Sequence, residues 1–111
     1  MDKAATHLLV LTTCPDAESA EALARGLVEA GLAACVNVVP GLRSYYRWEG
    51  RMESASEHLL VAKTRSDRYA AVEGAIRARH PYQLPEVLAV PVAEGLTEYL
   101  KWVDDCVRPE R

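Results

Sequence analysis

One cysteine and one histidine have side chains suited to metal or thiol chemistry. Cys14 follows a short apolar run and precedes a predicted helix that begins after Asp16. The positive end of the helix dipole would lower the pKa of a thiol there, which favours a metal ligand or a reactive thiol; the alternative is a small structural residue at a turn. His80 ends a second predicted helix, where it serves either as a C-terminal cap or as a functional imidazole.

A thiolate and an imidazole are suitable ligands for copper, which heads the Irving–Williams order among divalent ions. Two ligands per chain make only a weak site, so the sequence predicts weak copper binding through Cys14 and His80. Neighbouring chains could supply further ligands. The predicted helices could instead place the two residues at opposite ends of the domain, so a shared ion requires the fold to bring sulfur and ring together.

Aromatic and charged residues form a second candidate set. Tyr45, Tyr46 and Trp48 either stack on a ligand or, as aromatic enrichment at interfaces favours, pack against a partner chain. Lys63 ends an apolar strand and is either solvated or paired with a carboxylate such as Glu86. The sequence has no Ser/His/Asp constellation, no H-E-x-x-H motif and no suggestive carboxylate pair, and we therefore predict that the protein is not an enzyme.

Hydrophobic periodicity predicts the elements that must position these side chains, because continuous apolar runs are typical of buried strands and i, i+3, i+4 stripes of helices. Strands are predicted at His7–Thr13, Ala33–Val39 continuing as Leu42–Trp48, a return strand ending at Thr64, and Glu86–Val92. Helices are predicted to start at the caps Asp16, Ser66 and Thr97, and to stop at Gly31, Pro81 and Pro109.

This order is β-α-β-β-α-β with an added C-terminal helix, the α+β plan of a ferredoxin-like split β-α-β sandwich with a long hairpin. The helices would cover one face of the sheet only. Because the first, third and fourth strands are apolar nearly throughout, we expect self-association to cover the other face.

Bulk properties restrict the function classes. The 111 residues make one domain, 1–111, and the net charge of −3 disfavours a nucleic-acid partner. No apolar run approaches the roughly 20 residues needed to cross a bilayer, and no signal peptide is evident, so we expect a cytoplasmic protein and no membrane partner.

Three cysteines are not a disulfide framework; Cys35 is expected in the core and Cys106 in the core or an interface. His7 and His58 are expected at the surface.

Three known activities of this fold are disfavoured. An RNA-recognition module would carry stacking aromatic residues on its two central strands, whereas the first and third strands here carry none. A soft-metal chaperone of this fold would have a C-x-x-C motif after the first strand, where only Cys14 is present. An acylphosphatase-like enzyme would need an arginine in a glycine-rich phosphate-binding loop after the first strand, and no glycine stands there.

Several short motifs, in order, make the chain similar to the CutA divalent-ion tolerance family. The quoted runs are Val10–Asp16 (VLTTCPD), Gly31–Asn37 (GLAACVN), Tyr46–Gly50 (YRWEG), Lys63-Thr64, His80–Glu86 (HPYQLPE) and Tyr99–Trp102 (YLKW). The resemblance implies a homotrimer similar in plan to the PII signalling proteins, a link to tolerance of divalent metals, copper in particular, and no established reaction. It also implies metal ligands near the end of the first strand and before the "PY". This sequence keeps His80. Arg79 stands where some members have a second histidine, and Thr12 stands where some members have the cysteine.

Three functions follow as alternatives. The first is a metal-responsive protein that binds copper or another divalent ion, which folding does not require. The second is a PII-like regulator that holds a small anion or metabolite in a cleft between subunits, lined by Tyr46, Trp48, Lys63 and Glu86. The third is a scaffold whose self-assembly is its main property.

Overall fold

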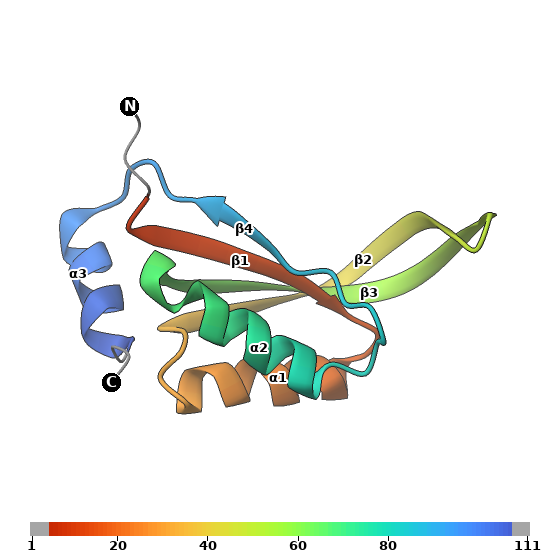
Figure 1. The fold of residues 1–111 in the computed structure, drawn as a ribbon, viewed down its shortest axis with the longest axis horizontal. Coiled ribbons are helices and arrows are strands. Elements are labelled where there is room, and N and C mark those ends of the chain that lie inside the picture. The colour runs from red at the N-terminus through yellow and green to blue at the C-terminus, as the bar shows by residue number, and fades with distance from the viewer. Residues whose placement is uncertain (1–4, 108–111) are drawn as a thin grey trace.

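The computed structural model describes residues 5–107 as a four-stranded antiparallel sheet with three α-helices. The elements are β1 (His7–Cys14), α1 (Ala17–Glu29), β2 (Cys35–Trp48), β3 (Arg51–Arg65), the 3₁₀ turn η1 (Ser66–Arg68), α2 (Tyr69–Arg79), β4 (Leu88–Pro91) and α3 (Thr97–Cys106). The strand order is β2-β3-β1-β4, and α1 and α2 lie on one face of the sheet (Figure 1). The predicted α+β architecture is confirmed.

The core lies between the sheet and these two helices. Val10 and Leu60 of the central strands are fully buried against Leu23, Leu27 and Ile76 of the helices. Alternate residues of a strand point to opposite faces, so every second residue of β1 and β3 enters this layer. Burial of each large apolar side chain in this layer stabilises the folded state by about 1.5–3 kcal/mol.

Local signals at the ends of α1 are as predicted. The Asp16 carboxylate accepts a hydrogen bond from the Ser19 backbone N–H at 2.8 Å, the usual N-cap contact. At the other end Gly31 has φ of 73°, its N–H donates to the Val28 carbonyl, and the Leu32 N–H donates to the Leu27 carbonyl. This pair of bonds is a Schellman motif, which needs a residue in the left-handed region.

The predicted caps of the other two helices are wrong. Ser66 begins η1 and its N–H donates to the Thr6 carbonyl, so α2 starts three residues later at Tyr69 without a side-chain cap. Thr97 is the first residue of α3, and Leu96 occupies the cap position. At Ser66 the backbone bond to Thr6 has overridden the local cap preference; no contact among the described residues explains the shift at Thr97. The predicted stop at Pro109 lies outside the described residues.

The fourth strand is shorter than the predicted Glu86–Val92. Only Leu88–Pro91 pairs with β1, although the Val92 N–H still donates to the His7 carbonyl at 3.0 Å. Pro91 lacks an N–H and lies in an edge strand, where proline is tolerated.

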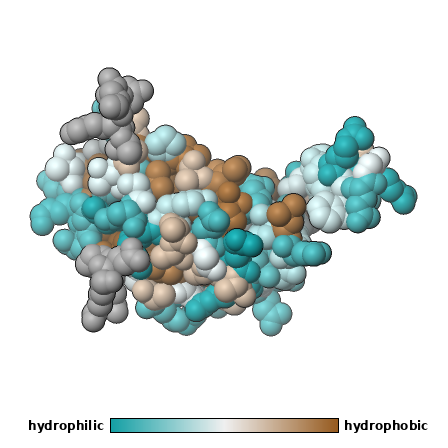
Figure 2. All heavy atoms as spheres, viewed as in Figure 1, coloured by the Kyte–Doolittle hydropathy of each residue, from teal (hydrophilic) through white to brown (hydrophobic). Residues whose placement is uncertain are grey.

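The face of the sheet away from α1 and α2 is apolar and open. By register it carries Val39, Leu88 and Val90, each more than 40% exposed, together with half-buried leucines and valines of β1 and β3. Figure 2 shows hydrophobic residues gathered over the body near β4, whereas the projecting hairpin is mostly hydrophilic. A patch of this kind marks an interaction surface.

The β2–β3 hairpin extends beyond the body (Figure 1). β1 pairs with β3 only from His58 to Arg65, so among the described residues Arg51–Glu57 has β2 as its only neighbouring strand. The two strands bend at an irregularity between Val39 and Leu42, which contains Gly41 at φ 80°. At the tip Glu49 and Gly50 both have positive φ, as a two-residue type I′ turn requires.

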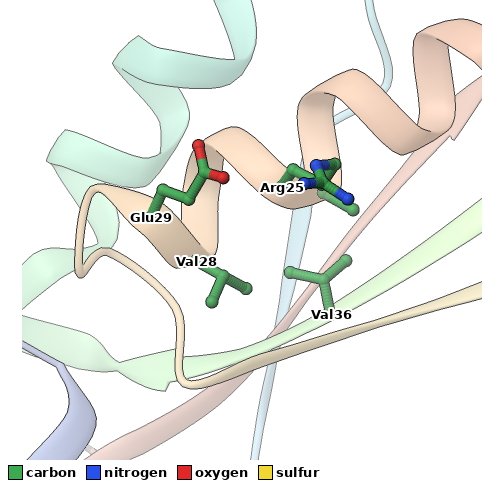
Figure 3. A pocket seen from close by; sticks show the side chains of 5 residues that line it. Arg25, Val28, Glu29 and Val36 are labelled. Atoms are coloured by element: carbon green, nitrogen blue, oxygen red, sulfur yellow. The ribbon is translucent and has the colours of Figure 1, made fainter.

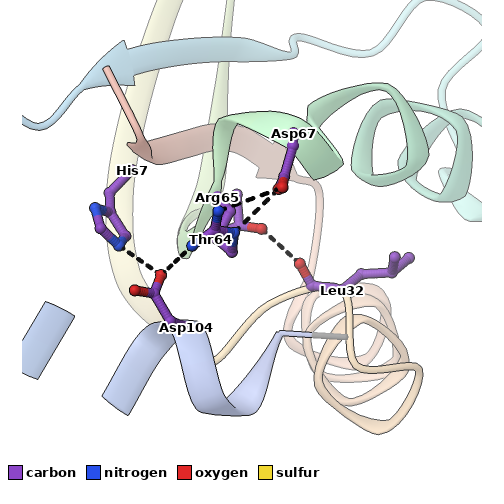
Figure 4. A network of polar contacts seen from close by, with 6 residues as sticks. All are labelled: His7, Leu32, Thr64, Arg65, Asp67 and Asp104. Atoms are coloured by element: carbon purple, nitrogen blue, oxygen red, sulfur yellow. Dashed lines mark hydrogen bonds and ion pairs between the residues drawn. The ribbon is translucent and has the colours of Figure 1, made fainter. Parts of the chain in front are cut away.

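A polar cluster attaches α3 to the end of the sheet where β1 begins and β3 ends (Figure 4). The Asp104 carboxylate accepts hydrogen bonds from His7 Nε2 at 2.8 Å and from the Arg65 guanidinium, which also contacts Asp67. Burial alone would raise the pKa of Asp104, but the hydrogen bonds from His7 and Arg65 outweigh it and hold the pKa below its usual value. His7 is therefore a structural residue rather than the surface residue predicted.

Asp104→Asn is expected to lower the free energy of unfolding by about 1 kcal/mol at neutral pH, the range for partly exposed ion pairs. Because the folded-state pKa lies below the unfolded value of about 3.9, the stabilisation is complete above that value and is lost as the pH falls through the folded-state pKa. The difference between wild type and variant should shrink below about pH 4 in urea titrations. Asp105→Asn, on the same helix and exposed, is the control. A difference independent of pH would contradict the assignment.

Candidate functional site

The fold brings Cys14 and His80 together, with Sγ and Nε2 3.8 Å apart across 66 positions of sequence. The topology explains the contact. β3 runs antiparallel to β1 and ends where β1 begins, so α2 runs back and ends near the end of β1, where α1 starts. Pro81 favours extended backbone at the residue before it, and His80 has ψ of 139°, which ends the helix at this point.

Both ring nitrogens of His80 are engaged. Nε2 lies 2.7 Å from the Thr13 carbonyl oxygen, which can only accept, so Nε2 carries a proton. The Tyr82 backbone N–H donates to Nδ1 at 3.0 Å, so Nδ1 carries none. His80 is 9% exposed and is held as the Nε2–H tautomer, and the Tyr82 ring lies against it, tilted, at a centroid distance of 4.9 Å.

Of the two alternatives for Cys14, its environment fits the structural residue better than the reactive thiolate. The side chain is fully buried, and this burial raises the pKa of the thiol, with smaller contributions from the nearby carboxylates of Asp16 and Glu57. A hydrogen bond with Ser19 acts in the opposite direction but does not compensate. Burial is the largest of these influences, and with its pKa raised the thiol is protonated at neutral pH.

A second set of contacts joins this site to the hairpin. The Tyr82 hydroxyl donates to Glu57 Oε2 at 2.7 Å, and the Ser44 hydroxyl of β2 donates to Glu57 Oε1 at 2.6 Å. Glu57 is 7% exposed. Burial and the Glu57 hydrogen bond both raise the pKa of Tyr82, so its hydroxyl stays a donor.

Sequence reasoning missed Glu57 and Ser44, which sit in a polar alternating stretch that resembles a solvated hairpin. Tyr82 lies within the quoted His80–Glu86 run, which was the one available signal.

The geometry of the pair suits two ligands of one ion. Metal–sulfur and metal–nitrogen bonds of roughly 2.3 and 2.0 Å allow donor atoms about 3–4 Å apart, and the observed separation is 3.8 Å. Within residues 5–107, however, no group of three or more His, Cys, Asp or Glu side chains is arranged to hold a metal. An ion placed between Cys14 and His80 would therefore have two protein ligands from one chain.

The four residues predicted to line a cleft do not meet within one chain. Tyr46 and Trp48 lie near the hairpin tip, both partly exposed, whereas Lys63 lies near the other end of β3. Glu86 precedes β4, two strands away from Lys63.

Lys63 contacts side chains of β2 and not Glu86, one of its two predicted alternatives. Its ammonium group donates to the Asn37 side-chain oxygen and lies 3.6 Å from the sulfur of Cys35, directly opposite on β2. Cys35 therefore lies half-buried on the open face and not in the predicted core; Cys106 is also half-buried.

A shallow hollow of about 280 Å³ lies between the C-terminal half of α1 and β2 (Figure 3). Val28 of α1 and Val36 of β2 point toward one another across it, and Ala24, Arg25 and Glu29 complete its lining. It lies roughly 15 Å along α1 from the Cys14 end, at 1.5 Å per residue, and contains none of the predicted site residues.

Residues 8–106 match the protein family described as CutA1 divalent ion tolerance protein. The chain is 47% identical over 95 residues to the divalent-cation tolerance protein CutA of Thermus thermophilus, covering 86% of this chain and 92% of that protein. It is 48% identical over 95 residues to a CutA homolog of Xenopus laevis, covering 86% of this chain but only 63% of that longer protein.

Solved structures agree with these relatives. The crystal structure of CutA from Xylella fastidiosa has a TM-score of 0.91 and 44% identity, covering 93% of this chain and 99% of that one. A protein of Archaeoglobus fulgidus, described as a periplasmic divalent cation tolerance protein, has a TM-score of 0.89 and 41% identity, covering 92% and 99%. Among the described residues, no helix has both the length and the apolar character to cross a membrane.

Cys14 in the folded protein is expected to react with iodoacetamide at least about tenfold more slowly than in urea, because it is buried and its thiol stays protonated. Mass spectrometry of timed, quenched samples gives the rates for each cysteine. The half-buried Cys35 and Cys106 serve as internal comparisons. Equal rates for Cys14 in folded and unfolded protein would show that the thiol is accessible.

Proposed function

We propose that this chain, which belongs to the CutA1 divalent ion tolerance protein family, acts in divalent-cation tolerance by binding copper between Cys14 and His80. The observation that carries the proposal is the 3.8 Å approach of a thiol and an imidazole from distant parts of the sequence. Sulfur and imidazole nitrogen are ligands that suit copper. The family is described by tolerance and not by a reaction, and no catalytic step is part of the proposal.

Binding would work against the resting state of the site. Cys14 must lose the proton that burial retains, and this lowers the affinity at a given pH. His80 must free a ring nitrogen from the Thr13 carbonyl or from the Tyr82 amide. A site with these costs and two ligands is suited to reversible binding that responds to metal concentration, with further ligands supplied by neighbouring chains.

The protein is further proposed to act as a homotrimer. The open apolar face of the sheet and the two-stranded hairpin both support self-association, because an isolated two-stranded ribbon has little stability of its own. A cytoplasmic location stays a prediction, since one structural relative is described as periplasmic.

A second candidate function is regulation by a small anion or metabolite in a cleft between subunits. Lys63 favours it, because within the part of the chain described its ammonium group has only neutral partners, Asn37 and Cys35. An anionic ligand would balance this charge. Tyr46, Trp48 and Glu86, which are separated in one chain, would then have to be contributed by neighbouring subunits.

Sedimentation equilibrium at low micromolar concentration is expected to give three times the chain mass of 12.2 kDa. Leu88→Glu, placed on the open face, is expected to shift this distribution towards smaller species, whereas Glu29→Gln on the exposed end of α1 should not. A monodisperse monomer of the wild type would end the trimer proposal.

Copper(I) affinity, measured anaerobically by competition with a chromophoric chelator, is expected to fall at least about tenfold in Cys14→Ser and in His80→Ala. Cys106→Ser is the matched control, since that thiol lies on α3 away from the site. An unchanged affinity in both variants would place any copper elsewhere in the molecule.

A further inference from the structure

A thiol and a primary amine from different strands are in contact at one corner of the open face. Cys35 is the first residue of the edge strand β2 and lies directly opposite Lys63 of β3. The distance between Lys63 Nζ and Cys35 Sγ is 3.6 Å. Asn37, two residues along β2 on the same face, donates to the same sulfur at 3.9 Å. Two of the sequence motifs, GLAACVN and Lys63-Thr64, therefore meet at this point.

Backbone and buried hydrogen bonds hold the two residues opposite one another. The Ala34 N–H donates to the Lys63 carbonyl at 2.9 Å. The buried Thr64 hydroxyl donates to the Leu32 carbonyl at 2.7 Å (Figure 4). These bonds involve the neighbours of Cys35 and Lys63 on both strands, so the approach of sulfur and nitrogen is set by the register of the sheet.

We infer that Cys35 and Lys63 are a modification site, at which a hydroperoxide converts the thiol and the amine into a covalent sulfur–nitrogen bond, a sulfenamide. The site lies on the face of the sheet opposite to Cys14 and His80, and it rests on neither proposed function.

The reaction balances in two steps with hydrogen peroxide as the oxidant. In the first step the thiolate sulfur of Cys35 attacks one peroxide oxygen, the O–O bond breaks, and a sulfenic acid and water are formed. In the second step the Lys63 amine, having given one proton to water, attacks this sulfur; the S–N bond forms, the S–O bond breaks, and hydroxide leaves as water with a second proton from nitrogen. Sulfur loses two electrons, peroxide is reduced to water, and the thiol and the neutral amine together lose two hydrogen atoms.

The geometry favours this pair of groups. A separation of 3.6 Å is close to the roughly 3–3.5 Å from which bond-forming reactions proceed. The four-carbon stem of lysine is flexible and closes the remaining distance without movement of the backbone. Hydrogen peroxide is similar to water in size, so the half-burial of Cys35 does not exclude it.

The other two cysteines lack this arrangement. Cys14 is fully buried, and its contact is the imidazole of His80. Cys106 lies on α3 five residues after Lys101, a spacing that does not place two side chains on the same face of a helix. Oxidation of these two thiols therefore has no neighbouring amine to trap the sulfenic acid.

The bond would change both the charge and the connectivity of the sheet. It removes the positive charge of Lys63, which is the charge that the second candidate function uses. It also joins the edge strand to β3 across 28 positions of sequence, as a cross-link that restrains the unfolded chain. Thiols reduce sulfenamides, so the change is reversible.

The test treats the whole folded protein with a small molar excess of hydrogen peroxide, blocks free thiols with N-ethylmaleimide, and analyses a tryptic digest by mass spectrometry. Trypsin does not cut after a substituted lysine, so peptide 26–43 should appear linked to peptide 52–65. The mass should be the sum of the two peptides less two hydrogen atoms, and dithiothreitol should separate them. Under denaturing conditions the intact mass should stay that of one chain, because the bond forms within a chain.

Two comparisons make the result specific. Lys63→Arg keeps the positive charge but replaces the amine by a guanidinium that does not deprotonate, so the linked peptide should fall at least about tenfold and Cys35 should proceed to sulfinic acid. Lys101→Arg, at an exposed lysine of α3, is the matched control and should keep the yield of wild type. In urea the wild type should also lose the linked peptide at least about tenfold, which tests the geometry without any variant.

Three outcomes would overturn the inference. One is the absence of the linked peptide from folded wild type. Another is an equal yield in urea, since the bond would then not depend on the fold. The third is loss of two hydrogen atoms from peptide 26–43 while trypsin still cuts after Lys63, because the sulfur would then have reacted with a backbone nitrogen.

Discussion

The antiparallel pairing of β3 with both β1 and β2 is the constraint on which the rest of the structure depends. β3 is a single strand of 15 residues, and its second half joins the central strand of the body while its first half forms the hairpin. Because β3 returns the chain to the start of β1, α2 must run back to the end of β1. The contact between Cys14 and His80 is thus a consequence of strand pairing and not of any local signal.

At the site itself, solvation decides the chemistry. A thiol next to a helix start is expected to ionise easily, but the side chain of Cys14 is fully buried and its pKa rises. His80 is similarly restrained, since a carbonyl and an amide hold its two nitrogens. Free of ligand, the site is therefore a neutral pair of hydrogen-bonded groups, and its reactivity depends on what can displace those bonds.

Patterns in the sequence predicted the fold well, because periodicity and caps report directly on burial and backbone geometry. Asp16 and Gly31 are correct to the residue, since each carries out its role within one turn. Ser66 fails as a cap because its backbone N–H is bonded to the Thr6 carbonyl, a contact between residues distant in sequence. The partnership of Glu57 with Tyr82 could not be predicted, since it joins residues 25 positions apart and depends on where a loop crosses the end of β1.

The register of the hairpin restricts how its length can change in evolution. Tyr46 and Trp48 share one face with Ser44 and Glu57, whereas Arg43 and Arg47 point to the other. An insertion or deletion of one residue in either strand would exchange these faces beyond that point. Relatives with longer or shorter hairpins should therefore differ by matched pairs of residues, one in each strand, and the turn at Glu49-Gly50 would move outward or inward unchanged.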